Sequence, residues 1–274
     1  GGRLLRDAFN AAATGYEVVL HEGWPEDARA FERAAAVVLS MDGRRGHLAL
    51  RHLDALDALA ERGTGILALH WAVHVPAGEP GDAFLRWIGG FYESGFSTNP
   101  KWDAALSLDA SHPVARGIAD RGPIVVHDEW YFRMRFREGE GDPRVRAIAT
   151  AVPSDEDRSR VSAFWPWARP PRGVREESGR RETLVWSVER ADGGRGLGFT
   201  GGHYHWNLGN DAFRTLLLNA MLWVAGGDVP EGGVPSRTPT FEELRAGQDE
   251  REPWGFDADA VRERFGLKLA TPAH

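Results

Sequence analysis

Cysteine is absent from the 274-residue sequence, and its absence excludes several chemistries at once. Without thiols there can be no disulfide bonds, no thiolate metal ligands and no cysteine nucleophile. The lack of disulfides fits a reducing compartment, and no secretory leader is recognisable, so we expect a cytoplasmic protein. No apolar run approaches the roughly 20 residues of a membrane-spanning helix, so we expect no membrane association.

Positive charge is also in short supply. The chain carries 33 Lys and Arg against 40 Asp and Glu, a formal net charge of -7. This balance argues against nucleic acid or anionic lipid as a partner. The apolar fraction of 42% and the charged fraction of 27% are those of an ordinary globular protein. Most of the eleven tryptophans are expected to fill the core.

Short apolar runs alternate with amphipathic segments over the first part of the chain. Strands are predicted at 16–22, 35–43 and 65–70, and helices at 1–15, 25–34 and 48–65. This alternation predicts right-handed crossovers and an α/β fold, with a mainly parallel sheet flanked by helices. Because the chain opens on a helix, the first strand of such a sheet, and the loop after it, would lie upstream of residue 1.

The pattern becomes less regular after about residue 91. Further strand material is predicted at 122–136, 145–152, 182–189 and 195–203, followed by a helix at 210–227. The stretch 153–181 is rich in Pro, Arg and Glu and is expected to be a surface excursion.

We therefore expect one domain over 1–228, with 229–274 as an extension packed on its surface. The apolar side chains of the extension could dock on the same subunit or on a neighbouring one, which would allow a homo-oligomer. These side chains are Phe241, Leu244, Trp254 and Phe265.

Polar and aromatic residues follow three of the predicted strands. His70 and His74 follow the strand 65–70, the run 127–130 reads His-Asp-Glu-Trp, and His203 and His205 follow the strand 195–203. The carboxyl ends of parallel strands meet at one rim of a sheet, where ligands bind in α/β proteins. These three loops are therefore expected to form one site.

The chain resembles the ThuA-like family of trehalose-utilisation proteins over most of residues 16–245. The resemblance rests on "GILALHWAVHVPAGEPGDAFLRWIGGFYE", "SHPVARGI", "HDEWYFRMRF" and "GFTGGHYHWNLGNDAFRTLLLNAMLWVAG". It implies a flavodoxin-like fold similar to that of class I glutamine amidotransferases. It also implies a role in carbohydrate metabolism, acting on a disaccharide, a glycoside or a 3-keto sugar.

The comparison with the amidotransferases is informative because their cysteine is missing. His70 and Trp71 stand where those enzymes carry the nucleophile, while His205 would match their late histidine and Asn207 its acid. A thioester mechanism needs a thiolate, so this protein is not a glutaminase. Histidine and carboxylate side chains can instead move protons at a sugar hydroxyl or beside a ketone.

The candidate residues fall into three groups. The predicted catalytic residues are His70, His205, Glu129 and Asp128. The predicted substrate-binding residues are His74, Trp71, Trp130, His203, Trp206, Asn207 and Arg133. No cofactor is assigned, but His70, His203 and His205 with one carboxylate would suit Zn²⁺ or Mn²⁺.

A purely structural role remains an alternative for the residues of each group. A histidine at a strand end can be a hydrogen-bonded core residue, and one of the adjacent acids, Asp128 or Glu129, is expected to be structural. The function is then either that of a sugar or keto-sugar enzyme of isomerase or hydrolase type, or that of a non-catalytic sugar-binding module on the same scaffold.

Overall fold

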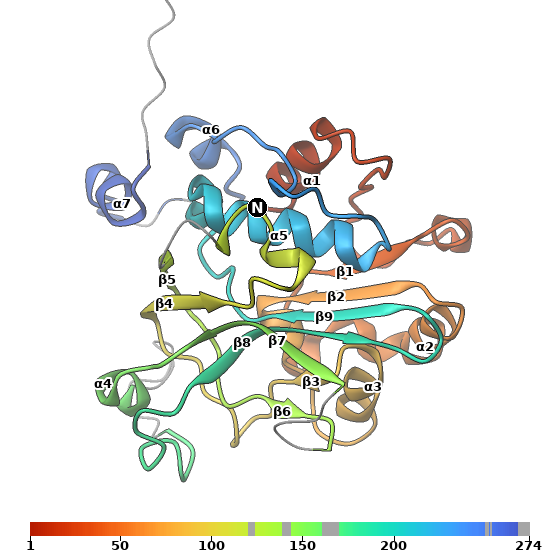
Figure 1. Ribbon diagram of the computed structural model, residues 1–274, viewed down its shortest axis with the longest axis horizontal. Coiled ribbons are helices and arrows are strands. Elements are labelled where there is room, and N and C mark those ends of the chain that lie inside the picture. Colours follow the sequence, from red (N-terminus) through yellow and green to blue (C-terminus); the bar gives the residue numbers. More distant parts are fainter. Residues whose placement is uncertain (120–123, 139–143, 161–169, 250–251, 253, 268–274) are drawn as a thin grey trace, which may run out of the picture.

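A mixed sheet is the centre of the computed structural model, which describes residues 1–119, 124–138, 144–160, 170–249, 252 and 254–267 (Figure 1). Within these residues the sheet has the strand order β1-β2-β9-β8-β7-β4-β5. Its strands are β1 (Ala36–Leu39), β2 (Gly65–Leu69), β4 (Trp102–Leu108), β5 (Ile124–Asp128), β7 (Val145–Ala151), β8 (Glu182–Glu189) and β9 (Arg195–Phe199). A small second sheet pairs β3 (Gly90–Phe91) with β6 (Arg135–Phe136).

The predicted α/β fold with a parallel core is confirmed. β2 pairs in parallel with β1 on one side and with β9 on the other, so β2 and β9 end at the same edge of the sheet. The strands from β8 to β5 add to this core in antiparallel order, which makes the sheet mixed as a whole. Every residue of β2 is buried, as expected for a central strand covered on both faces.

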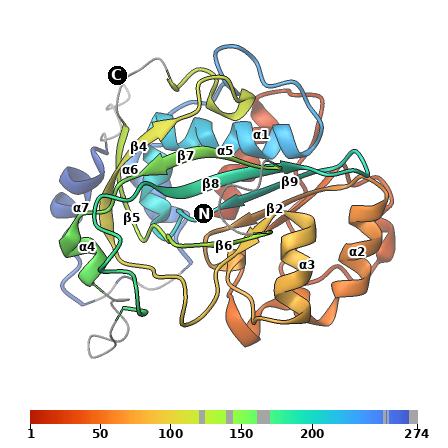
Figure 2. The ribbon, with the colours of Figure 1, turned by 60° about the horizontal axis from the view of Figure 1, so that its bottom comes forward.

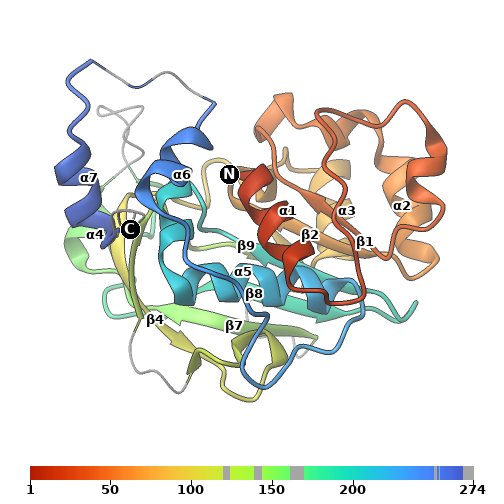
Figure 3. The ribbon, with the colours of Figure 1, turned by 90° about the horizontal axis from the view of Figure 1, so that it is seen from above.

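Helices cover both faces of the sheet. Figure 2 shows α5 (Asp211–Val224) on one face and the pair α2 (Leu53–Glu61) and α3 (Glu79–Trp87) on the other. Seen from above in Figure 3, α1 (Gly2–Ala11) and α6 (Phe241–Ala246) lie beside α5 on the outer side. The remaining helices are the short α4 (Asp155–Ser159) and α7 (Ala258–Phe265). No described helix is long and apolar enough to cross a membrane.

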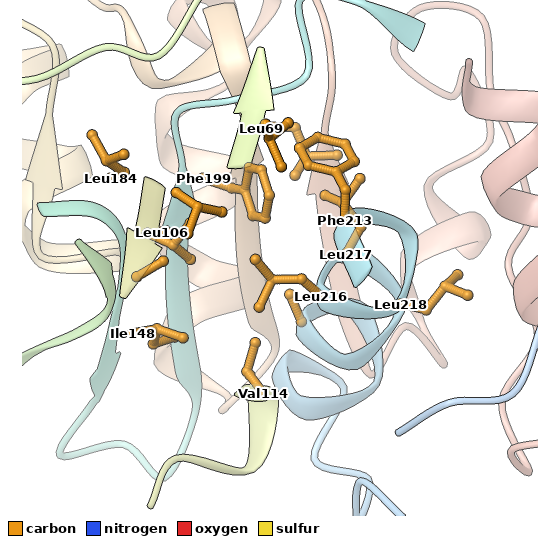
Figure 4. Close-up of a cluster of buried hydrophobic side chains, with 14 of the residues drawn as sticks. Leu69, Leu106, Val114, Ile148, Leu184, Phe199, Phe213, Leu216, Leu217 and Leu218 are labelled. Carbon is orange, nitrogen blue, oxygen red and sulfur yellow. The ribbon is translucent and has the colours of Figure 1, made fainter. Parts of the chain in front are cut away.

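The larger core lies between the sheet and α5. Phe213, Leu216 and Leu217 of this helix pack against the sheet residues Leu69 and Phe199 (Figure 4). The helix begins where the Asn210 side chain, as its N-cap, accepts a hydrogen bond from the backbone N–H of Phe213. Because β2 and β9 carry the side chains that α5 covers, the helix fixes the ends of both strands.

The strand predicted at 16–22 does not form. The backbone N–H and carbonyl groups of Val18 are bonded instead by the side chain of Asn10, at 2.7 and 3.1 Å. Val19 and Leu20 remain 65% and 41% exposed. Apolar, β-branched composition therefore produced an extended segment here, but no neighbouring strand pairs with it.

Two other local predictions differ from the structure. The segment 25–34 forms only a short 3-10 turn, Ala28–Phe31, capped by Asp27. The helix predicted at 48–65 is split into a 3-10 turn, Leu48–Arg51, and α2. Neither α3 nor β4 was predicted from the sequence.

The stretch 153–181 is not simply an exposed excursion, although 161–169 lies outside the described residues. Arg158 on α4 is fully buried and pairs with Glu182 at 2.8 Å, and Val174 is part of the main core. In the extension, Phe241 and Leu244 are buried against the same chain, whereas Trp254 is fully exposed.

Candidate functional site

His70 stands at the point where β2 ends and a 3-10 turn begins. Its backbone has a φ of +49°, a left-handed conformation that is uncommon for a residue with a side chain. Its ring Nδ1 lies 2.9 Å from the carbonyl oxygen of Thr200, the residue that follows the neighbouring strand β9. This contact holds the imidazole across the ends of the two parallel strands.

Glu129 reaches the same place from the segment after β5. The carboxylate of the preceding residue, Asp128, accepts hydrogen bonds from the backbone N–H groups of Gly202 at 2.7 Å and His203 at 3.0 Å. These bonds attach the end of β5 to the turn after β9, although the two strands lie far apart in the sheet order. Glu129 is thereby placed between His70 and His203.

The three side chains meet at a single carboxylate oxygen. Glu129 Oε2 lies 3.0 Å from Nδ1 of His203 and 3.4 Å from Nε2 of His70. The hydroxyl of Tyr131 lies 3.1 Å from the same His70 nitrogen. We call His70, Glu129, His203 and Tyr131 the rim cluster. The side chains of the two histidines are 15% and 23% exposed, so the cluster is within reach of a ligand.

Glu129 is held as a carboxylate despite its burial. Burial raises the pKa of this side chain, but the hydrogen bonds and charges of His203 and His70 outweigh that effect and lower it to about 2. The other carboxylate oxygen, Oε1, accepts a hydrogen bond of 2.9 Å from Asn99 Nδ2. Burial and the negative charge of Glu129 raise the pKa of Tyr131 well above its ordinary value, so its hydroxyl keeps its proton.

The turn after His70 provides a wall beside the cluster. His74 is buried, with Nε2 2.8 Å from the Ser94 hydroxyl and its ring against Tyr92. Burial, with the positive charge of Arg44, lowers the pKa of His74 to about 3, so the ring is neutral. Trp71 is 40% exposed and is the tryptophan of the predicted site that a ligand can reach.

The family model of ThuA, described as trehalose utilisation, matches residues 9–224. This chain belongs to the ThuA family. Two solved structures are similar, both of ThuA-like proteins. The one from Bacteroides uniformis ATCC 8492 has 16% identity and a TM-score of 0.49, covering 72% of this chain and 71% of its own. The one from Parabacteroides merdae ATCC 43184 has 18% identity and a TM-score of 0.49. The match covers 86% of this chain and 92% of the Parabacteroides chain. No curated protein matches the sequence.

Within this ThuA-family chain, Asp128 builds the site but does not face a ligand. It is fully buried, and besides the bonds from Gly202 and His203 it accepts from the N–H groups of Tyr204 and Glu129 and from Asn207 Nδ2. Asn207 is buried as well and also donates to the carbonyl of His127 at 2.9 Å. The predicted catalytic role of Asp128 and the substrate-binding role of Asn207 are therefore corrected to positioning.

The predicted sugar platforms Trp130 and Trp206 are core residues. Trp130 has no exposed surface and donates from its indole nitrogen to the carbonyl of Val126 at 3.0 Å. Trp206 is 7% exposed and is stacked on Phe241 of the extension, with ring centroids 5.4 Å apart. Neither indole face is free for a ligand, because the core and the extension already cover them.

His205 and Arg133 contact residues outside the rim cluster. A 3-10 turn begins at His205, so the two-residue spacing of an extended strand does not place this side chain beside that of His203. Its Nε2 lies 3.0 Å from the carbonyl oxygen of Leu244, and burial lowers its pKa. Arg133 pairs with Glu177 at 3.2 Å and donates to the carbonyl of Arg172, so the described contacts of its guanidinium are structural.

Tyr131, Tyr92 and Asn99 were not predicted as site residues. A signal for Tyr131 exists, because side chains two residues apart in an extended segment share a face, and Tyr131 follows Glu129 at that spacing. Asn99 carries no such signal, because its contacts to Glu129 and to the Tyr92 hydroxyl arise from the fold.

The metal-binding set also changes. His70, Glu129 and His203 offer ligand atoms that all lie within 4.8 Å of one another, whereas His205 is not part of this group. Two imidazoles and one carboxylate are ligands that suit Zn²⁺ and other divalent transition metals.

Proposed function

We propose that this ThuA-family protein is an enzyme of carbohydrate metabolism that acts on a sugar or keto sugar at the rim cluster. The observation that carries the proposal is the meeting of two imidazoles, a carboxylate and a phenol, partly exposed, at the ends of the parallel strands. These groups can remove a proton from a carbon beside a ketone and return one to the substrate. This is isomerase-type chemistry, and proton transfer to a glycosidic oxygen, with water attacking the anomeric carbon as the glycosidic C–O bond breaks, would give hydrolysis.

The contacts of each side chain indicate its role in the reaction. Glu129 and the imidazole of His203 form one acid–base pair, with Oε2 and Nδ1 3.0 Å apart. The Tyr131 hydroxyl, which keeps its proton, can donate a hydrogen bond to a carbonyl or alkoxide oxygen. Trp71, the exposed indole, offers a flat face for a pyranose ring.

The test uses trehalose, maltose and their 3-keto forms with the purified full chain in D₂O. Proton NMR would detect both new products and deuterium entering at the carbon beside the ketone. We expect exchange or turnover by the wild type and at least a roughly 100-fold loss in Glu129→Gln and Tyr131→Phe, the lower end of the range for positioned acid–base groups. Asp103→Asn, on the exposed face of β4, is the matched control and should retain the wild-type rate.

A non-catalytic sugar-binding module is the second candidate, favoured by the replacement of the amidotransferase cysteine by His70 in a left-handed turn. Calorimetry separates the two functions. Binding of a sugar with no exchange and no product over long incubation would refute the enzyme and support the binding module.

A further inference from the structure

The environment of His70 can hold a cation beside Nε2. Because the Thr200 carbonyl can only accept, the ring nitrogen Nδ1 that faces it carries the hydrogen. In a neutral ring, Nε2 then presents a lone pair toward Glu129 Oε2 at 3.4 Å. The Tyr131 hydroxyl, 3.1 Å away, can donate to this lone pair, but the carboxylate oxygen has no hydrogen to donate. The contact between Nε2 and Oε2 therefore becomes attractive only when a proton or a metal ion lies with them.

The two contacts of Glu129 Oε2 match the edges of a metal coordination shell. Two ligand atoms that are each about 2.05 Å from one ion are about 2.9 Å apart at a right angle and about 3.3 Å apart at the tetrahedral angle. The two contacts of Glu129 Oε2, at 3.0 and 3.4 Å, lie close to these values. The three ligand atoms all lie within 4.8 Å of one another, and binding one ion requires the two histidine nitrogens to be no more than about 4.1 Å apart. We propose that His70 Nε2, Glu129 Oε2 and His203 Nδ1 bind one divalent transition-metal ion.

The surroundings of the three ligands support the proposal. Metal-bound histidines usually donate their second ring N–H to a carbonyl or carboxylate, as His70 does to Thr200. The free oxygen of Glu129 is fixed by Asn99, and the backbone of His203 is fixed by Asp128 at 3.0 Å. These contacts orient the ligands in advance, so little rotational freedom is lost when an ion binds.

The composition of the ligand set indicates the class of ion. Two histidines and one carboxylate form the set of catalytic Zn²⁺ sites and of the facial triad that holds Fe²⁺, and Mn²⁺ accepts the same ligands. The carboxylate is 3% exposed whereas both imidazoles are partly exposed, which leaves coordination positions on the solvent side. A catalytic ion needs such open positions for water or substrate oxygen.

This inference rests on the proposed function for the location of the chemistry and deepens it. A bound ion would polarise a sugar carbonyl or hydroxyl oxygen as a Lewis acid. The imidazoles of His70 and His203 would then hold the ion, and the Tyr131 hydroxyl would remain to move a proton beside it.

The experiment measures metal binding directly. The full chain is stripped with a chelator and titrated with Zn²⁺, Mn²⁺ and Co²⁺ by calorimetry, and the Co²⁺ form is followed by its visible absorption. We expect one equivalent to bind with a sub-micromolar dissociation constant for at least one ion. Glu129→Gln and His203→Ala should weaken binding at least about 100-fold, and Asn99→Ala, which keeps all three ligands, by about 10–100-fold.

His205→Ala is the matched control, because it removes a histidine two residues from His203 whose Nε2 contacts Leu244. Its affinity should stay within a few-fold of the wild type, with folding of every variant checked by circular dichroism. Absence of stoichiometric binding, or binding unchanged in Glu129→Gln and His203→Ala, would overturn the proposal, as would equal loss in His205→Ala.

The two proposals can fail separately. Absence of stoichiometric metal binding together with full sugar turnover by the chelator-stripped protein would overturn the metal site and leave the acid–base function standing. Stoichiometric metal binding without any reaction of the tested sugars would support the metal site and overturn the acid–base function.

Discussion

Replacing Asp128 by asparagine should destabilise the protein strongly. The buried carboxylate accepts from Gly202 and Asn207 on Oδ2. It accepts from Glu129, His203 and Tyr204 on Oδ1. An asparagine keeps one oxygen, and its NH₂ group would then face at least two donors that have lost their acceptor. Each buried donor left without a partner costs about 1–3 kcal/mol, so the free energy of unfolding should fall by about 2–6 kcal/mol.

Urea denaturation followed by tryptophan fluorescence measures this loss, with Asp103→Asn as the control. Asp103 is also an acid paired with a histidine on the same sheet, but its side chain is 66% exposed, so its loss should cost less than about 1 kcal/mol. Glu129→Gln gives a second contrast. Its amide can still bond Asn99 and a neutral imidazole, so we expect it to lose activity far more than stability.

The opposite pattern would refute this assignment of roles. If Asp128→Asn unfolds within about 1 kcal/mol of the wild type yet has lost all activity, Asp128 belongs to the reacting groups. The bonds to the β9 turn would then not be what positions His203.

Two further predictions concern residues outside the rim cluster. Burial lowers the pKa of His112 to about 4, and its ring is engaged by the Val114 N–H and the Ser187 hydroxyl. The unfolded chain takes up a proton near pH 6.5 but the folded chain only near pH 4, so stability is lost as the pH falls through this window, by about 3 kcal/mol. In urea denaturation at several pH values, the free energy of unfolding of His112→Asn should therefore fall less steeply between pH 6.5 and pH 4 than that of the wild type. An equally steep fall would contradict the prediction. Trp206→Ala should cost about 3–5 kcal/mol in the same assay by emptying the space against Phe241, whereas a raised KM at full stability would make it a sugar platform after all.

The parts of the fold that follow from local pattern were predictable. The continuous apolar run of β2 and the capped apolar helix α5 appear within a few residues of their expected bounds. β4 was also within reach, because its burial alternates residue by residue from Trp102 to Leu106. The strand at 16–22 failed for the opposite reason, since pairing depends on a neighbour that the local sequence does not specify.

The site was predicted by topology and missed in its details. His70 and His203 could be placed together because the loops after neighbouring parallel strands share one edge. The division of roles between Asp128 and Glu129 depends on how the chain turns after β5, and two adjacent acids look alike in sequence. Whether Trp206 is exposed or buried depends on an extension more than 30 residues later in the chain, in which Phe241 covers its ring.

The bonds that assemble the rim cluster join residues that are remote in the chain. His70 and Thr200 are 130 positions apart, His70 and Tyr131 are 61 apart, and Asp128 and Gly202 are 74 apart. Loops of this size close late in folding, because their entropy cost must be met before the contacts can form. No short piece of the chain can therefore hold the cluster. A ligand bound at the cluster would add its binding energy to the stability of the whole protein. Because the cluster exists only in the folded chain, a bound ligand would also indicate that folding is complete.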